Sequence, residues 1–271
     1  MKLCVNCLIF CLSLVLSHNL LSAPPVIASE TIYTYEVIAE RPHDSRFFTQ
    51  GLELHNNQFY ESSGLYNQSF ITRYPIDTTD KDKSDKKSSS SKLMQPLAAH
   101  YFAEGLTLFN NKLFVLTWRE QTLLVYEPDT FELLQTHRYS GQGWGLTNNG
   151  KQLIRSDGSN TLYFHSPKNF ALHKTVKVYR HLQAVERLNE LEYVKGKVWA
   201  NIWYDNHLVE IDPGTGQVVG IVDLTELVGS IPSTSSEQVL NGIAYDTAQD
   251  AFWITGKLWP KMFLIKLTAR E

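Results

Sequence analysis

The chain has 271 residues, of which 43% are hydrophobic and 12% aromatic, and it carries 15 glycines. This is enough apolar material for a full core, and the aromatic and glycine content favours strands and turns over helices. A formal net charge of −3 gives no sign of binding to nucleic acid or to an anionic membrane surface.

The first 28 residues have the pattern of a secretion signal. Lys2 precedes an uncharged apolar run over residues 3–17, and the small residues Ala23 and Ala28 suit signal peptidase. We expect cleavage after Ala28 and export to the periplasm or the medium, with no stable membrane association afterwards. The alternative is an uncleaved anchor, but the run is shorter than the roughly 20 residues of a spanning helix.

The 3 cysteines, Cys4, Cys7 and Cys11, all lie in this segment. None has the small-residue context at the end of the segment that lipidation needs. The mature chain is therefore expected to have no disulfide, no thiol nucleophile and no cysteine-based metal site.

A short phrase recurs five times along the rest of the chain. FTQGLEL at Phe48 returns as FAEGLTL at Phe102 and, more loosely, near residues 143, 188 and 240. The anchors of the five phrases are 40 to 54 residues apart and are Gly51, Gly105, Gly145, Glu190 and Gly242. Because a four-stranded blade needs roughly 40–50 residues, the spacing predicts an all-β fold, a closed five-bladed β-propeller.

Each repeat contains two further strand signals. An aromatic-rich run follows a turn pair in four repeats, at Asn56–Asn57, Asn110–Asn111, Asn149–Gly150 and Lys195–Gly196. A run of alternating apolar and polar residues comes next, near residues 70–74, 123–126, 162–165, 208–212 and 262–266. Such period-two runs between short turns predict antiparallel meanders.

Residues 29–271 are expected to form a single domain. A polar loop insertion at 78–92, rich in Lys, Asp and Ser, lengthens the first repeat. The orphan strand Tyr33–Ile38 is predicted to pair beside the C-terminal blade, because that pairing hides both sheet edges. Removing residues 31–39 should then destabilise the whole ring.

Candidate site residues are those that depart from the repeat near one mouth of the channel. The innermost phrases supply Phe48, Gln50, Phe102, Glu104, Trp144, Asn189 and Glu190, and the ends of the second strands supply Trp118, Trp203, Lys257 and Trp259. Each has a plainer interpretation, since tryptophans pack in cores and a lone Glu or Lys is commonly a surface residue. Gln50 and Glu104 share one register and Asn189 follows one residue off it, so convergence on one axis favours a small-molecule pocket with apolar walls and a few placed polar groups.

The same phrases resemble the plant and bacterial type of glutaminyl-peptide cyclotransferase, the glutamine cyclotransferase family. The resemblance covers roughly residues 35–267, and GWGLTNNGKQLIRSDGS at Gly143 and TGKLWPK at Thr255 also carry it. It implies a five-bladed propeller that converts the N-terminal glutamine of peptides to pyroglutamate and releases ammonia. One departure is Gln142, where an acidic residue often precedes GWGL, so a charge role at that position is in doubt.

Site roles follow from the resemblance residue by residue. It implies a catalytic glutamate at Glu104 and a polar pair at Asn189 and Lys257. Substrate-holding residues are implied at Phe48, Gln50, Phe102, Trp118, Trp144 and Trp203. We expect Glu104 to move the proton and the tryptophans to exclude water. Lys257 and Asn189 are expected to donate hydrogen bonds to the γ-carbonyl oxygen or to fix the peptide backbone.

The expected partners are peptide or protein substrates with an N-terminal glutamine, acted on by a monomer. The 9 histidines show no HExxH pattern, so no metal and no cofactor is expected, although a structural cation in the channel stays open. One rival is a non-catalytic propeller that binds peptides or a protein partner. Another is a calcium-dependent lactonase, for which the inner phrases look too poor in carboxylates.

Overall fold

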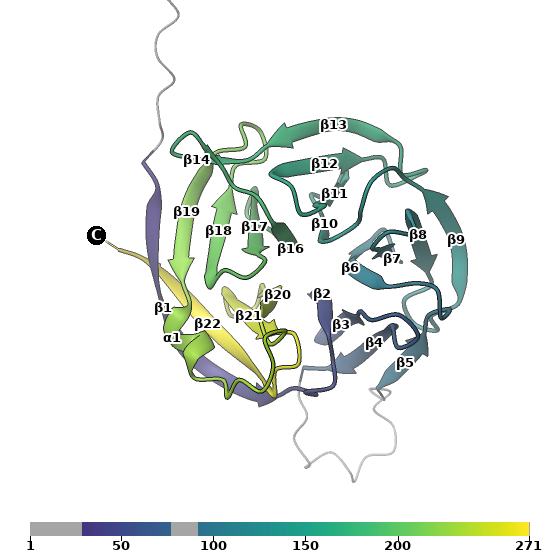
Figure 1. Cartoon of the computed structure of the whole chain (residues 1–271), viewed down its shortest axis with the longest axis horizontal. Helices are drawn as coiled ribbons and strands as arrows, with labels where there is room; N and C mark the ends of the chain where they lie inside the picture. The colour runs from purple at the N-terminus through teal and green to yellow at the C-terminus, as the bar shows by residue number, and fades with distance from the viewer. Residues whose placement is uncertain (1–28, 77–91, 271) are drawn as a thin grey trace, which may run out of the picture.

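The computed structural model describes residues 29–76 and 92–270, and almost all of their regular structure is β-strand (Figure 1). The all-β prediction is therefore confirmed. The predicted signal segment 1–28 lies outside the described residues, as does the predicted insertion 78–92 except for Lys92. In the described part of the chain no helix has the length and apolar character needed to cross a membrane.

Three sheets are four-stranded antiparallel meanders whose strands follow one another in sequence. The first contains β2 (Thr49–His55), β3 (Gln58–Ser63), β4 (Phe70–Pro75) and β5 (Leu93–Pro96). The second contains β6 (Ala103–Phe109), β7 (Lys112–Thr117), β8 (Thr122–Tyr126) and β9 (Leu133–Arg138). The third contains β10 (Leu146–Asn148), β11 (Leu153–Arg155), β12 (Thr161–His165) and β13 (Leu172–Lys177).

The largest sheet has eight strands in the order β16-β17-β18-β19-β1-β22-β21-β20. One half contains β16 (Leu188–Val194), β17 (Lys197–Ile202), β18 (His207–Ile211) and β19 (Val218–Asp223). The other half contains β1 (Thr31–Pro42), β20 (Leu240–Asp246), β21 (Ala251–Gly256) and β22 (Lys261–Ala269). Smaller elements are β14 (Tyr179–Arg180), β15 (Gln183–Ala184) and the helix α1 (Thr225–Gly229).

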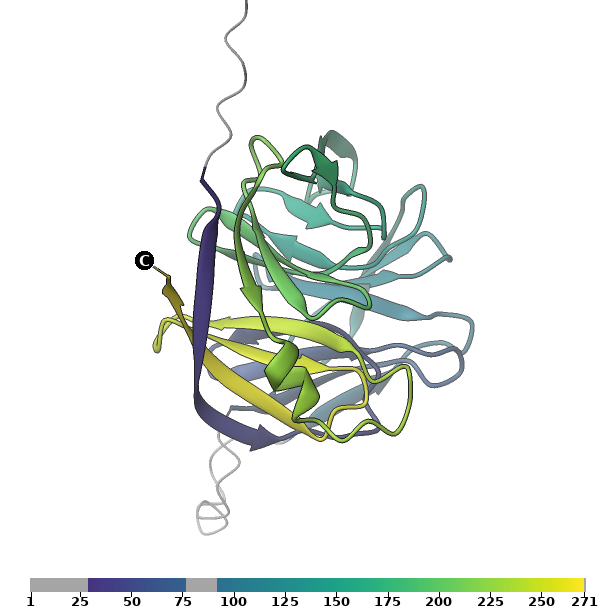
Figure 2. The same ribbon diagram turned by 60° about the vertical axis from the view of Figure 1, so that its left-hand side comes forward.

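The N-terminal strand β1 connects the two halves of the large sheet. It pairs antiparallel with β22 over residues 33–42 and parallel with β19 over residues 31–33 (Figure 2). The predicted pairing of the N-terminal strand with the last strands of the chain is confirmed. The short parallel pairing with β19 was not predicted, and it merges two meanders into one continuous sheet.

The innermost strands form a closed ring. β2 contacts β6, β6 contacts β10, β10 contacts β16, β16 contacts β20, and β20 returns to β2. Buried apolar clusters lie between neighbouring sheets; one of them packs Ile154 and Leu162 of the third sheet against Val198 and Val209 of the next. The fold is therefore β-propeller-like, with the core between sheets and the inner strands around an axis (Figure 1).

The repeated glycine of the phrase has a steric cause. A Cβ on Gly51 would lie 2.5 Å from Leu106 N, and one on Gly105 would lie 2.4 Å from Leu146 N. At these two glycines the inner strand thus approaches the backbone of the next one more closely than a side chain permits. The hairpin turn predicted at Asn56–Asn57 is also present, because both residues have the positive φ that a tight turn requires.

Candidate active site

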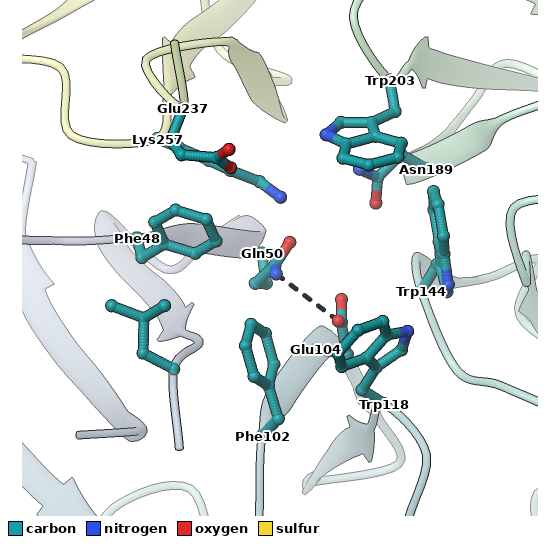
Figure 3. Close-up of a pocket in the computed structure, with 11 residues that line it drawn as sticks. Phe48, Gln50, Phe102, Glu104, Trp118, Trp144, Asn189, Trp203, Glu237 and Lys257 are labelled. Carbon is teal, nitrogen blue, oxygen red and sulfur yellow. Dashed lines mark hydrogen bonds between the residues drawn. The ribbon is translucent and has the colours of Figure 1, made fainter. Parts of the chain in front are cut away.

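A cavity of about 260 Å³ opens at one end of the ring (Figure 3). It is lined by Phe48, Gln50, Leu65, Phe102, Glu104, Trp118, Trp144, Asn189, Trp203, Glu237 and Lys257. Antiparallel pairing explains why these residues lie together, since the start of each inner strand lies beside the end of the second strand of the same sheet. Gln50 and Glu104 come from strand starts, whereas Trp118 and Trp203 directly follow second strands.

A shared backbone irregularity directs the polar residues into the cavity. The pairing register shifts between Thr49 and Gly51, between Ala103 and Leu106, and between Leu188 and Leu191. Gln50, Glu104 and Asn189 lie in these three shifts. A β-bulge re-aims a side chain at the end of a ladder, so a register shift in each of these three inner strands turns their polar groups toward one point.

Glu104 is a buried carboxyl with little hydrogen bonding. Its side chain belongs to a residue that is 4% exposed, and Gln50 Nε2 donates to its Oε1 at 3.4 Å. Burial raises the pKa of Glu104 well above its ordinary value; the charge of Lys257 opposes the rise and that of Glu120 adds to it. The environment therefore favours a carboxyl that exchanges a proton at higher pH than usual.

Lys257 is a buried ammonium on the opposite side of the cavity. Its residue is 5% exposed, and Nζ lies 4.7 Å from the centroid of the Phe48 ring. Burial lowers the pKa of Lys257, while the charges of Glu104 and Glu237 work against that effect. Nζ makes no hydrogen bond or ion pair with any residue in the described ranges, so its donors are available to a ligand.

Three more polar atoms in the cavity wall are buried without a partner: Gln50 Oε1, Asn189 Oδ1 and Trp203 Nε1. A buried polar group left unpaired costs about 1–3 kcal/mol, so these atoms indicate where a ligand makes its hydrogen bonds. Two of them accept and one donates. A ligand that fits must present N–H donors as well as at least one acceptor.

The side-chain amide of Gln142 orients two of the tryptophans that line the cavity. Gln142 Oε1 accepts hydrogen bonds from Trp118 Nε1 at 2.8 Å and from Trp144 Nε1 at 3.0 Å. Trp118 follows β7 of the second sheet and Trp144 precedes β10 of the third, so the amide ties neighbouring parts of the ring together. The ring of Trp203 meets that of Trp144 edge-on, with centroids 5.4 Å apart.

The sequence comparisons agree with this geometry. A sequence model of the family described as glutamine cyclotransferase matches residues 8–267. The chain belongs to the glutamine cyclotransferase family. It is 35% identical over 243 residues to the glutaminyl-peptide cyclotransferase of Arabidopsis thaliana, covering 88% of this chain and 73% of that protein. The crystal structure of Myxococcus xanthus glutaminyl cyclase matches with a TM-score of 0.80 and 37% identity, covering 90% of this chain and 100% of that one.

All nine residues that the resemblance to glutamine cyclotransferases implied line the one cavity. Two further predicted mouth residues do not. Glu190 is fully buried in the channel, where its carboxylate accepts from Leu52 N and Ile243 N. Trp259 is also fully buried and packs in the apolar cluster around Phe263.

The sequence prediction missed Leu65 and Glu237. Leu65 comes shortly after the second strand of its sheet, as Trp118 does, so a search by equivalent position would have found it. Glu237 lies in a polar segment before β20 that has no strand periodicity, and no signal pointed to it. Across residues 29–76 and 92–270, no group of three or more His, Cys, Asp or Glu side chains is arranged to hold a metal ion.

Proposed function

We propose that this protein cyclises the N-terminal glutamine of peptides and proteins to pyroglutamate, with Glu104 as the proton shuttle. One observation carries the proposal. A buried, weakly hydrogen-bonded carboxyl faces a buried, unpaired ammonium across an aromatic pocket whose free polar atoms match a glutamine side chain. Membership of the family and the named activities of its relatives support the same reaction.

The reaction is an intramolecular acyl transfer. The α-nitrogen forms a bond to the side-chain carboxamide carbon, and the bond from that carbon to the amide nitrogen breaks. One proton leaves the α-nitrogen and one reaches the departing nitrogen, which is released as ammonia. A single group that accepts and then donates serves both steps, and a carboxyl with a raised pKa suits it.

Negative charge develops on the carboxamide oxygen during the attack. Lys257 Nζ and the unpaired Trp203 Nε1 are the donors in the wall that support this oxygen. Asn189 was expected to donate as well, but its unpaired atom is the acceptor oxygen. We therefore assign Asn189 Oδ1 and Gln50 Oε1 to the substrate N–H groups, which holds the side chain curled against the α-amine.

The direct test uses a purified sample and a glutaminyl-alanine dipeptide. The expected products are ammonia and a peptide lighter by one ammonia. N-acetylglutaminyl-alanine is the matched control, because it has no free amine and should stay unchanged. Release of ammonia from the control, or a product that has gained water, would mean hydrolysis and would contradict cyclisation.

We also propose the finer architecture and cellular setting. The order of the eight-stranded sheet supports two four-stranded blades joined through β1 and β19, which gives five blades in one domain over residues 29–271. The N-terminal apolar run supports export with cleavage after Ala28, and N-terminal sequencing of the exported protein tests it. We propose a monomer that needs no metal, with activity retained in EDTA as the check.

A further inference from the structure

Glu237 is a carboxylate at the edge of the cavity that the proposed mechanism does not use. Tyr204 OH donates to its Oε1 at 3.1 Å, and the Tyr204 ring packs on Trp203 with centroids 4.6 Å apart. Its backbone is also held, since Ser235 Oγ accepts from Glu237 N and Val239 N donates to Glu237 O. Glu237 is therefore a positioned side chain rather than a free surface charge.

The segment around Glu237 is tied to the site as well. Gln238 Nε2 donates to the carbonyl of Leu258 at 3.0 Å, next to Lys257. Figure 3 shows the Glu237 carboxylate beside Lys257, on the side of the cavity away from Trp118. Its charge acts on Lys257 and helps keep that amine protonated.

Glu237 differs from Glu120, a carboxylate outside the cavity lining whose charge acts on Glu104. Both oxygens of Glu120 are occupied, because they accept from Tyr66 OH and Phe102 N. The Arg119 guanidinium lies 3.8 Å from the centroid of Trp118, on that same side. Within the described residues the Oε2 of Glu237 has no hydrogen-bond partner. Glu237 is thus free to bind a donor from a ligand.

We propose that Glu237 and Tyr204 form the subsite for the residue that follows the substrate glutamine, and that this subsite favours Lys or Arg over Asp or Glu. The inference rests on the proposed function. If the glutamine occupies the pocket, the rest of the peptide must leave through its open end. There it meets a carboxylate with a free oxygen and a tyrosine that is 46% exposed.

The expected preference is modest because the subsite is open to water. Exposed ion pairs change binding by about two- to fivefold, and a like charge disfavours binding by a similar factor. An aromatic ring beside the carboxylate adds a surface on which a cationic side chain can pack. The ratio of kcat/KM for a Gln-Lys peptide to that for a Gln-Glu peptide is therefore expected to be about tenfold at low salt.

The experiment compares the dipeptide amides Gln-Ala, Gln-Lys and Gln-Glu by ammonia release. Screening shortens the reach of exposed charges to about 3 Å at 1 M salt, so the Lys-to-Glu ratio should fall toward one there. Glu237→Gln should lower the Lys-to-Glu ratio at low salt to about one as well. Glu132→Gln is the matched control: it removes an equal charge from the exposed segment between β8 and β9, away from the cavity, and should leave the ratio as in the wild type.

The possible outcomes separate this inference from the proposed function. No release of ammonia from any peptide would overturn both. Turnover of Gln-Ala with a Lys-to-Glu ratio near one would overturn the subsite alone, as would a ratio that Glu237→Gln leaves intact. An equal loss of the ratio in Glu132→Gln would assign the preference to net charge and would also overturn the subsite.

Discussion

Two buried pairs of an acid and a base lie in this ring, and they differ in almost every respect. In the first, His43 Nε2 lies 3.0 Å and 3.2 Å from the two oxygens of Glu61. The same carboxylate accepts from Thr49 Oγ1 at 2.6 Å and from Tyr74 OH at 2.6 Å. In the second pair, Glu104 accepts one hydrogen bond of 3.4 Å and Lys257 makes none with a described residue.

The protonation equilibria diverge accordingly. Burial would raise the pKa of Glu61, but the charge and hydrogen bond of His43, with those from Thr49 and Tyr74, lower it. Burial would lower the pKa of His43, but Glu61 raises it. For Glu104 and Lys257 the effect of burial is larger than that of the neighbouring charges. Burial raises the pKa of Glu104 and lowers that of Lys257, so the neutral form of each is favoured. Burial alone therefore does not mark a catalytic group; Glu104 and Lys257 are candidates because they are buried, have few or no hydrogen-bond partners and line the cavity.

The two pairs also serve different parts of the molecule. His43 follows β1, its Nδ1 lies 2.8 Å from the carbonyl oxygen of Trp259, and Glu61 belongs to β3. The His43–Glu61 pair, whose hydrogen bonds are satisfied, thus holds the segment after the N-terminal strand against the segment before β22. The Glu104–Lys257 pair, which is unsatisfied, faces the cavity.

The largest expected effect comes from Glu104→Gln, which removes the titrating group and keeps its shape. We expect kcat to fall by about 10²–10⁴-fold, the usual contribution of a general acid–base, since the amide cannot carry the proton. Thermal unfolding should show no loss of stability, because a neutral amide replaces a carboxyl that burial already disfavours as an anion. Turnover within a fewfold of the wild type would show that Glu104 does not carry the proton.

The satisfied pair should respond in stability instead. Glu61→Gln leaves His43 buried without a counter-charge, and breaking a buried pair costs about 3–5 kcal/mol in the free energy of unfolding. Urea unfolding at about pH 6 measures this cost. A loss below about 1 kcal/mol would mean that the network contributes little to holding the ring together.

The pH dependence of that cost has a defined sign. The raised pKa of His43 gives stability that is complete below its ordinary value of 6.5 and is lost as pH rises through the folded-state pKa. The lowered pKa of Glu61 gives stability present above 4.5 and lost on acidification through its folded-state pKa. The difference between wild type and Glu61→Gln should therefore be greatest between pH 4.5 and 6.5, as unfolding across pH would show.

Lys257→Arg tests the cation of the unsatisfied pair. Because burial lowers the pKa of Lys257, the wild-type kcat/KM is expected to decline at a lower alkaline pH than an ordinary lysine would give. Arginine stays charged throughout, so the decline should move to higher pH in the variant even if its maximum is reduced. If kcat/KM of the variant declined at the same alkaline pH as that of the wild type, a group other than Lys257 would be responsible for the decline.

Gln142 gives the smallest effect. Gln142→Leu removes the shared acceptor of the Trp118 and Trp144 indoles, and we expect KM to rise several-fold with a smaller change in kcat. Gln142→Glu keeps an oxygen in place and should remain close to the wild type. Steady-state kinetics with one dipeptide distinguishes the two, and equal defects in both variants would argue against an orienting role for the acceptor.

The sequence predicted the site where the repeat has a defined register. Gln50 and Glu104 occupy the same place in two phrases, and the same bulge turns both inward. Neighbouring positions on a strand point to opposite sides, so an offset of one residue separates Asn189 in the pocket from Glu190 in the channel. Trp259 was misplaced because a turn with positive φ at Leu258 precedes it and directs it into the core.

Other features could not be read from the repeat. Glu237 and Leu65 lie in connecting segments whose conformation depends on tertiary contacts, such as the bond from Tyr204 to Glu237. The parallel pairing of residues 31–33 with β19 depends on how two sheet edges meet in space. Gln142 attracted notice as a departure in charge, whereas its role in the fold is that of an acceptor for two indoles.

The pairing of β1 with β22 has a consequence for biosynthesis. Thr34 Oγ1 donates to the carbonyl of Thr268, a contact that spans 234 residues. A nascent chain emerges N-terminal end first, so β1 stays without this partner until β22 has been made. Contacts of such sequence separation also form slowly. Lys257 directly follows β21, so a polypeptide that stops before this point lacks both the strand β22 that closes the ring and the ammonium of the candidate site.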